Sequence, residues 1–366
     1  MAERIVVDDL SKSYAGGSQA LREVSLDVGP GTFLVLLGPS GSGKTTLIRC
    51  LAGIERISTG KITIGGVTVA DGQVHVPPEQ RELSMVFQDY ALWPHLTAAD
   101  NVAFALRRRR LSRADCRTSA QAMLDRVGLG ALGRRYPNEL SGGEQQRVAL
   151  ARALVAGTGL ILCDEPLSNL DADLRERLRV EIAALVRDSG ATTVYITHDQ
   201  AEAFALADRV GVLEHGRLVQ LGTPEEIYSQ PASPFVARFT GLSGELRVRA
   251  GACDAAGLID IEPAGPGWAS PLRVAARERV PRGGALLMIR PTGIALCDTH
   301  AGDHHLVGTV ADVAFRGRGY EHAVDVHGHG RLTGVFAPLR AARGDQVGLR
   351  LDTAGCHVFA EPAAGS

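Results

Sequence analysis

Residues Gly38–Thr45 read GPSGSGKT, and this octapeptide constrains the fold more than any other segment of the chain. It follows Phe33–Leu37, a continuous apolar run of the kind that forms a strand buried on both faces. Leu47, Ile48 and Leu51 follow it at helical spacing. A buried strand, a glycine-rich turn and a helix, in this order, predict an α/β fold with a phosphate-binding loop.

The residue types of the loop suit the binding of a nucleoside triphosphate. Gly38, Gly41 and Gly43 allow successive N–H groups to converge on an anion, and the helix adds about half a positive charge at its N-terminus. Lys44 is predicted to reach the β- and γ-phosphates, and the Thr45 hydroxyl to bind Mg²⁺. An ordinary glycine-serine turn is the alternative, which the Lys-Thr pair after a buried strand disfavours. The predicted ATP-binding residues of the loop are Gly38, Pro39, Ser40, Gly41, Ser42, Gly43, Lys44, Thr45 and Thr46.

A second buried-strand candidate, Leu160–Cys163, ends in two carboxylates, Asp164 and Glu165. At the carboxyl edge of a parallel sheet Asp164 would lie beside the phosphate loop and hold Mg²⁺ through water. Glu165 is placed to polarise the attacking water as general base. The alternative is an acidic turn after a strand, which the spacing to the other motifs disfavours.

A third element, Leu140–Glu144, reads LSGGE and opens a helix whose body is predicted over 145–156. Ser141 is a preferred N-cap residue, and Gly142 and Gly143 leave N–H groups uncovered, so this helix start is a second candidate anion site. A merely capped helix is the alternative. One chain would then carry two phosphate sites for one nucleotide.

The order of these three elements resembles that of the ATPase subunits of ABC transporters. The resemblance implies a phosphate-loop NTPase core with a helical subdomain, over about 89–157, and Mg²⁺ and ATP as ligands. It also implies a head-to-tail dimer, in which Ser141, Gly142, Gly143 and Glu144 of one copy close over the ATP of the other. Most members have glutamine where this chain has Glu144, and a carboxylate near a triphosphate is expected to weaken the closed state unless it points at the ribose.

Smaller signatures of that family fall in register. Tyr14 resembles the aromatic residue that stacks on adenine, with a buried strand-end tyrosine as the alternative. Gln88, in MVFQDY, resembles the glutamine that contacts Mg²⁺ and the attacking water. Asp171, in SNLD, resembles the loop that crosses the dimer interface, and His198, in THDQAEA, the histidine that contacts the γ-phosphate. The predicted catalytic residues are therefore Glu165, His198 and Gln88, and the predicted Mg²⁺ ligands Thr45, Gln88 and Asp164.

Composition agrees with two globular domains in 366 residues. The apolar runs are strand-sized, far short of the roughly 20 residues of a membrane span, and no charged-then-apolar leader opens the chain. A peripheral protein on the cytoplasmic face of the membrane is expected. The net charge of −2 gives no argument for nucleic acid. Six scattered cysteines without a CxxC pair indicate reduced, buried thiols rather than disulfides or a zinc site.

Prolines and glycines interrupt the sequence pattern near 231–244, which predicts a domain boundary and domains of 1–238 and 239–366. Short alternating runs such as 306–310 and 323–326 predict a small all-β, OB-like barrel in the second domain. Ile289-Arg290-Pro291 resembles part of the TOBE-like accessory domain of importers for spermidine, maltose, molybdate and ferric iron, although Thr292 replaces the usual glutamate. The histidines at 304, 305, 322, 327 and 329 lack a fixed ligand spacing, so solvated loops are preferred over a metal site.

Residues 90–110 begin the helical subdomain, and in the family this stretch forms the groove that receives the permease. Leu92, Trp93 and Leu96 would be its apolar contacts, with local core as the alternative. The arginines at 107–110 are expected to form a solvated helix end, with a weak role toward lipid headgroups possible in principle.

The sequence as a whole predicts the ATPase subunit of a binding-protein-dependent importer, with a second copy of itself, two permease subunits and, indirectly, a solute-binding protein as partners. A chromosome-maintenance or repair ATPase of the ABC family is one alternative, disfavoured because no long heptad region separates the phosphate loop from LSGGE. A detached exporter ATPase is another. The wording LWPHLT and the length place ferric iron first as cargo, ahead of polyamine or phosphonate.

Overall fold

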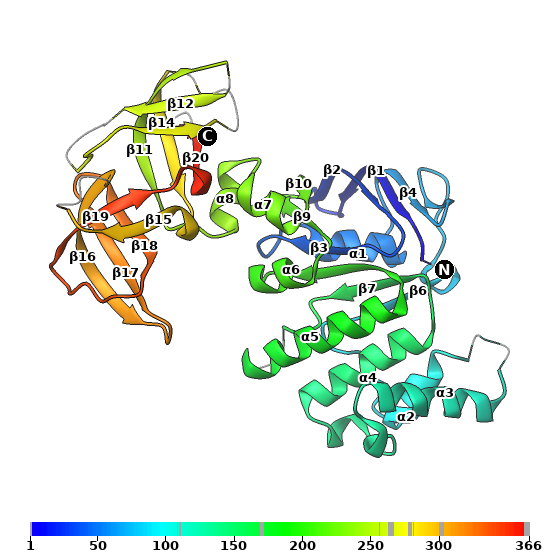
Figure 1. Ribbon diagram of the computed structural model, residues 1–366. Helices are drawn as coiled ribbons and strands as arrows, with labels where there is room; N and C mark the ends of the chain where they lie inside the picture. Colours follow the sequence, from blue (N-terminus) through cyan, green and yellow to red (C-terminus); the bar gives the residue numbers. More distant parts are fainter. Residues whose placement is uncertain are drawn as a thin grey trace. The chain divides into compact units, whose positions relative to one another are not determined.

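The computed structural model of the protein describes residues 2–107, 109, 111–168, 172–255, 257–262, 267–276, 280, 282–299 and 304–361. The chain divides into two compact units, Met1–Pro224 and Glu225–Ser366. The first is a mixed α/β unit and the second is largely β (Figure 1). No helix within the described residues is long and apolar enough to cross a bilayer.

A six-stranded sheet organises the first unit, in the order β10-β9-β3-β8-β7-β6. Its parallel strands are β3 (Phe33–Leu37), β6 (Leu83–Val86), β7 (Leu160–Asp164), β8 (Thr192–Thr197) and β9 (Arg209–Glu214), with β10 (Arg217–Gly222) antiparallel at one edge. β3, β7 and β8 are buried at every position, which suits the apolar runs of β3 and β7 and the β-branched and aromatic residues of β8. Helix α1 (Lys44–Ala52) follows β3 directly, as predicted.

An antiparallel sheet and a helical layer complete the first unit. The sheet contains β1 (Ile5–Ser13), β2 (Gln19–Val28), β4 (Thr59–Ile64) and β5 (Val67–Ala70), in the order β2-β1-β4-β5. Helices α2 (Ala98–Phe104), α3 (Arg113–Arg126) and α4 (Gly142–Val155) share a core that includes Val102, Leu124 and Val148. Helices α5 (Ala172–Ser189) and α6 (Gln200–Leu206) follow β7 and β8. The α/β core with a helical subdomain is confirmed.

The second unit contains α7 (Pro224–Ser229), α8 (Pro234–Phe239) and ten strands within the described residues. β11 (Gly244–Cys253), β12 (Leu258–Glu262), β13 (Leu272–Ala275), β14 (Gly283–Ile289) and β20 (Cys356–Ala360) form one antiparallel sheet. β15 (Ile294–Cys297), β16 (Leu306–Phe315), β17 (Tyr320–Val326), β18 (Gly330–Ala337) and β19 (Gln346–Leu351) form the other. Alternating inward residues of both sheets build one core, so the all-β prediction is confirmed.

The two units meet between 224 and 225, before the predicted boundary of 238/239. Arg290, which is fully buried, accounts for the difference. Its guanidinium donates to the carbonyls of Tyr228, Ala237 and Gly241 and lies 4.4 Å from the centre of the Tyr228 ring. These bonds attach α7 and α8 to the β unit, so the Arg-Pro pair noted in the sequence has a packing role here.

Two expectations about single residue types need correction. His322 lies in β17 rather than in a solvated loop, and it is fully buried, with its Nε2 accepting from Ala341 N at 3.1 Å. Cys253 is exposed, so the thiols are not uniformly buried. Burial raises the pKa of the Cys50, Cys163 and Cys356 thiols to about 12, which keeps them protonated and unreactive at neutral pH.

Candidate functional site

The predicted site residues gather at the carboxyl edge of the six-stranded sheet. The phosphate loop follows β3, His198 follows β8, Asp164 and Glu165 end β7, and Gln88 follows β6 by two residues. These four strands are neighbours in the order β3-β8-β7-β6. Parallel neighbours present their carboxyl ends together, which is where open α/β sheets bind ligands.

The phosphate loop curls around the ammonium group of Lys44. Lys44 Nζ donates to the carbonyls of Gly38 at 2.7 Å and Pro39 at 2.9 Å, and the residue is only 4% exposed. Burial lowers the pKa of Lys44, while the negative charges of Glu165 and Asp164 partly oppose that shift. A positive charge is therefore held inside the loop at the start of α1.

The backbone of the loop admits no larger residues at two glycines. A Cβ on Gly43, whose φ is 103°, would lie 2.6 Å from Ala20 O, and one on Gly38 would lie 2.4 Å from Leu213 O. Ser42 Oγ is buried and makes no hydrogen bond to any described part of the chain. The helix start has no side-chain cap, because Gly43 is its N-cap residue. The uncapped N–H groups, the buried hydroxyl and the lysine fit an anion such as a triphosphate.

Asp164 and Thr45 form a compact set of oxygen donors beside the loop. Thr45 Oγ1 lies 3.2 Å from Asp164 Oδ1. Burial raises the pKa of Asp164, opposed by the Thr45 hydrogen bond and by Arg49 and Lys44. Hydroxyl and carboxylate oxygens are the ligands that Mg²⁺ prefers, so these two residues fit this metal.

Glu165 and His198 face each other across the β7 and β8 ends. His198 Nδ1 lies 3.4 Å from Glu165 Oε2, and the histidine side chain is 56% exposed. Glu165 has a φ of 44°, an unfavourable left-handed conformation for a glutamate. Ser168 holds this conformation, since its N and Oγ both donate to the Glu165 carbonyl, at 3.2 and 2.9 Å. The turn thereby presents the carboxylate beside the phosphate loop.

The start of α4 is capped by its own side chains. Ser141 Oγ accepts from Glu144 N at 3.4 Å, while Glu144 Oε2 accepts from Ser141 N at 2.7 Å and from Ser141 Oγ at 2.8 Å. This reciprocal arrangement is a capping box. Gly142 and Gly143 form the first turn, and Ser141 is the N-cap residue, as its residue type indicated.

Tyr14 lies just beyond β1 and close to the phosphate loop. Its ring is partly exposed, its hydroxyl lies 3.4 Å from Thr46 Oγ1, and Lys12 Nζ lies 4.8 Å from the ring centre. An exposed aromatic face beside the loop is available for a base to stack on. Asp171, predicted to cross a dimer interface, lies outside the described residues.

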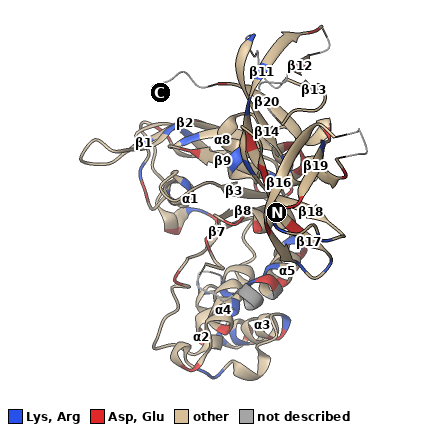
Figure 2. Cartoon of the chain, turned by 90° about the vertical axis from the view of Figure 1, so that its left-hand side faces the viewer, with Lys and Arg blue, Asp and Glu red and all other residues tan. Residues whose placement is uncertain are grey.

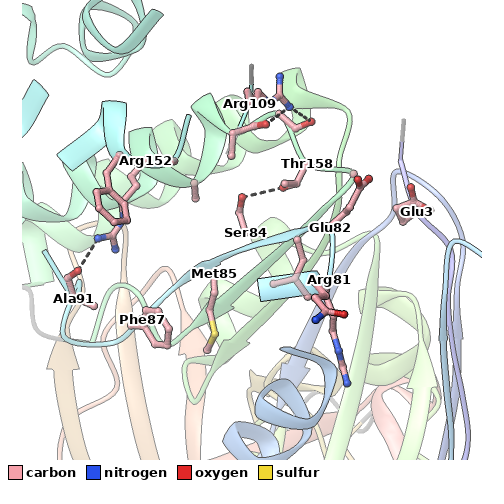
Figure 3. Close-up of a pocket in the computed structure, with 18 of the residues that line it drawn as sticks. Glu3, Arg81, Glu82, Ser84, Met85, Phe87, Ala91, Arg109, Arg152 and Thr158 are labelled. Carbon is pink, nitrogen blue, oxygen red and sulfur yellow. Dashed lines mark hydrogen bonds between the residues drawn. The ribbon is translucent and has the colours of Figure 1, made fainter. Parts of the chain in front are cut away.

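Beyond Gln88, which is exposed, the chain passes through two left-handed residues, Tyr90 (φ 64°) and Ala91 (φ 45°). Arg152 of α4 holds both, donating to the carbonyls of Ala91 at 2.6 Å and Tyr90 at 2.7 Å. Figure 3 shows its guanidinium pointing at Ala91. Arg152 joins the helix of LSGGE to the Gln88 loop. Sequence analysis missed it, and a lone arginine among alanines and leucines is the only signal that could have found it.

A groove of about 700 Å³ lies beside this loop, between β6 and helices α2 and α4 (Figure 3). Met85, Phe87, Trp93 and Phe104 supply its apolar lining. Leu92 instead packs on the core of the helical subdomain, so the groove and core interpretations apply to different residues of the same stretch.

Arg109 is exposed, in agreement with the expected solvated arginine end, and it also contacts the chain. Its guanidinium lines the groove and donates to the carbonyls of Ala156 and Gly157. Arg107 is exposed, with its guanidinium 4.6 Å from the centre of the Phe104 ring. Arg108 and Arg110 lie outside the described residues.

Comparison with known proteins agrees with this geometry. The sequence model of the ABC transporter family matches residues 21–168, and that of the TOBE domain matches 287–359. The Rhizobium etli protein named Fe(3+) ions import ATP-binding protein FbpC is 43% identical over 327 residues, which cover 88% of this chain and 87% of that protein. The chain belongs to the ABC transporter family. It is an ATP-binding, ATP-hydrolysing transport subunit with a C-terminal TOBE domain.

Further relatives in the ABC transporter family differ in how much of the chain they match. The FbpC protein of Brucella abortus is 43% identical over 328 residues, covering 90% of this chain and 89% of that protein. The trehalose/maltose import ATP-binding protein MalK of Thermococcus litoralis is 50% identical over 228 residues, covering 62% of this chain and 61% of that protein.

Solved structures show the same ATPase fold. A dimeric ATP-binding cassette in a post-hydrolysis state, bound to ADP and phosphate, has a TM-score of 0.54 and 30% identity, covering 60% of this chain and 98% of that one. A second dimeric bacterial ABC transporter cassette has a TM-score of 0.53 and 31% identity, with the same coverage of both chains.

Proposed function

We propose that this protein powers the import of ferric iron by hydrolysing ATP on behalf of a membrane permease. The observation that carries the proposal is the extent of the match to relatives named for Fe(3+) import. Their similarity runs through about nine tenths of the chain, well beyond the ATPase core.

The site chemistry assigns a role to each residue. Lys44 and the loop amides hold the phosphates, the Thr45 and Asp164 oxygens hold Mg²⁺, and Tyr14 stacks on the base. Mg²⁺, when bound, would neutralise charge on the phosphates. Glu165 accepts a proton from the attacking water, and His198, 3.4 Å from it, orients toward the γ-phosphate. Gln88 links this chemistry to the groove.

Two copies of the chain are proposed to act together. Each copy supplies the phosphate loop for one ATP and the Ser141–Glu144 turn for the other. The dimeric cassettes to which this chain is similar support that arrangement. The apolar groove with Trp93 at its rim supports docking of a permease, which would hold this subunit at the cytoplasmic face of the membrane.

Sugar import is the second candidate, because the relative with 50% identity is named for trehalose and maltose. That match covers 228 residues, a length close to that of the ATPase unit, 1–224. Importers of different cargoes share the chemistry of ATP hydrolysis, so a match confined to the length of the ATPase unit does not distinguish between cargoes. The relatives named for iron import match over a longer stretch, which favours iron.

Uptake in the native organism tests the cargo. Deletion of the gene should abolish uptake of radioactive ferric iron and leave maltose and spermidine uptake unchanged. A plasmid with the wild-type gene should restore uptake, and one with Glu165→Gln should not. Normal iron uptake with lost maltose uptake would overturn iron in favour of sugar.

A further inference from the structure

A buried carboxylate lines the same small cavity as the Glu165–His198 pair. Glu202, in the first turn of α6, is 5% exposed. Its Oε2 accepts from Tyr195 Oη of β8 at 3.3 Å, and the Thr197 hydroxyl also hydrogen-bonds its side chain. Glutamates are almost never buried in this way without partners, so this carboxylate has a defined place between elements.

Helix α5 supplies the opposite charge. Burial is the main cause that raises the pKa of Glu202, and the charge of Asp199 adds to it; the Thr197 and Tyr195 hydrogen bonds and, least, the charge of Arg175 oppose the shift. Arg175 and Glu202 line the same cavity. Arg179, one turn further along, donates to Ala201 O at 2.9 Å. The start of α6 is thereby held against α5, beside which it lies in Figure 1; Figure 2 marks the basic and acidic residues along α5.

A third arginine of α5 ties the other end of α6. Arg187 Nη2 donates to Leu206 O at 3.1 Å, at the last residue of α6. The spacing of 175, 179 and 187 places all three on one face of the helix. The α5–α6 contact has two ends. At the near end Arg175 lines the same cavity as Glu165 and His198, and at the far end Arg187 bonds Leu206.

The reactive and the buried residues also share one small cavity. Its volume is about 10 Å³, room for about one water molecule. Glu165, His198, Arg175 and Glu202 all line it, together with Leu167, Ser168, Thr197 and Asp199. Groups that face the same cavity this closely are sensitive to one another's position.

The chain connects the start of α6 directly to His198, so the packing of α6 affects the position of this histidine. His198 stands in the short turn between β8 and α6, where Asp199 caps α6 by accepting from Ala201 N and Glu202 N, at 2.7 and 3.2 Å. Glu165 directly follows β7, and it lines the same small cavity as Arg175 and Glu202. The place of His198 opposite Glu165 is therefore tied to the start of α6, which Asp199 caps and where Glu202 is buried.

We propose that Glu202 is a positioning residue, whose carboxylate, held between Arg175 of α5 and the Tyr195–Thr197 segment of β8, keeps His198 against Glu165. The inference rests on the proposed roles of Glu165 and His198 in ATP hydrolysis. Glu202 does not touch the nucleotide; it sets the geometry of the residues that do.

The Glu202→Gln variant of the full-length protein tests the proposal. Its amide can still accept from Tyr195, but the charge toward Arg175 is gone. The kcat for ATP should fall on the order of 10-fold or more, since small misplacements near reacting groups carry large rate costs. The KM and the nucleotide affinity should stay unchanged, because Glu202 and Arg175 are not part of the phosphate loop, which is proposed to hold the nucleotide. Equal losses in kcat and in nucleotide affinity would indicate a general structural defect and overturn the proposal.

Arg187→Gln is the matched control, because it loosens the same helix pair at the far end. It should lower the melting temperature and leave kcat unchanged. A kcat loss equal to that of Glu202→Gln would show that any loosening of α6 suffices, and would overturn a specific role for Glu202.

A double variant tests whether a lost rate comes only from leaving the Arg175 charge without the Glu202 charge. Glu202→Gln with Arg175→Gln removes both charges, so neither is left buried alone. It should fold and still turn over slowly. Wild-type turnover in the double variant would overturn the proposal.

Glu165→Gln in the same assay separates the two levels of inference. If Glu165→Gln hydrolyses ATP like the wild type, the proposed roles at the site fail. If it is inactive while Glu202→Gln is fully active, only the positioning role of Glu202 fails. If the site roles and the positioning role are both correct, adding Glu202→Gln to Glu165→Gln should lower the residual rate of ATP hydrolysis little further, because the two changes affect one step.

Discussion

The starts of helices α1 and α4 are both glycine-rich and both proposed to face phosphate, yet they are built in opposite ways. The start of α1 has a left-handed Gly43 as N-cap, no side-chain cap and no acid in its first turn. The start of α4 has Ser141 as N-cap and Glu144 closing a capping box. The first leaves its N–H groups open to an anion, whereas in the second the Glu144 carboxylate already accepts from Ser141 N and the Ser141 hydroxyl from Glu144 N.

This difference suggests a division of labour. An open helix start with a buried lysine can hold a nucleotide within one copy of the chain. A helix start that carries its own carboxylate must give up or share internal bonds before it accepts a phosphate, which suits a contact that forms and breaks in each cycle. The predictions below test the two starts separately.

The largest effect is expected from Lys44→Ala at the open start. Hydrogen bonds to charged groups contribute about 1.5–3 kcal/mol, so ATP affinity should fall on the order of 10- to 100-fold. The fold should persist, because the hydrogen bonds of Lys44 within the described part of the chain go to two carbonyls of its own loop. A nucleotide titration measures the affinity, with the exposed Lys61→Ala as control. Unchanged binding would remove Lys44 from the site.

A smaller effect is expected from the shape of the same loop. Gly43→Ala combines a positive φ with a Cβ 2.6 Å from Ala20 O, whereas Gly41→Ala, at φ 79°, meets nothing within 4 Å. Left-handed strain costs about 1–2 kcal/mol, so Gly41→Ala should lose about that much stability and Gly43→Ala clearly more. Denaturant unfolding compares the two variants. Equal losses would show that the loop relaxes around the added methyl group.

The smallest effect is expected at the capped start. Glu144→Gln keeps an acceptor for Ser141 N but removes the charge, so the helix should lose about 0.3–1 kcal/mol of stability. ATP-dependent dimerisation should nevertheless strengthen a few-fold, because a negative charge near the partner's phosphates is gone. Glu139→Gln is a matched control: Glu139 also accepts from a backbone amide, Tyr136 N at 2.8 Å, whereas Ser141 N and Oγ donate to Glu144. Weaker dimerisation of Glu144→Gln alone would contradict the account.

Much of the site could be predicted from sequence because its residues lie next to strand ends. Gly38–Thr45, Asp164 and Glu165 follow continuous apolar runs and His198 follows a run rich in β-forming residues, and parallel strands bring the positions at their carboxyl ends together. The capping box of Ser141 and Glu144 was also implicit in their spacing of three, although the sequence analysis considered this carboxylate only in relation to the nucleotide.

Residues whose role depends on distant packing could not be predicted. Arg152, Arg175 and Glu202 act across elements, and nothing in their local sequence states which carbonyl or carboxylate they will meet. The attachment of α7 and α8 to the β unit depends in the same way on Arg290, so the boundary inferred from local composition fell too late. His322 was assigned to a loop because the β-run predicted at 323–326 began one residue after it, whereas the strand begins at Tyr320.

The central claim is that the two helix starts act on the same ATP from two copies of the chain. Size-exclusion chromatography of Glu165→Gln with ATP tests it most directly, because the nucleotide still binds while loss of the general base slows hydrolysis about 10²–10⁴-fold. Glu165→Gln should elute as a dimer only when ATP is present, and the double variant Ser141→Arg/Glu165→Gln, altered at the second helix start, should elute as a monomer that still binds ATP. A double variant that dimerises as well as Glu165→Gln, or a Glu165→Gln protein that binds ATP and never dimerises even with its permease, would contradict the account.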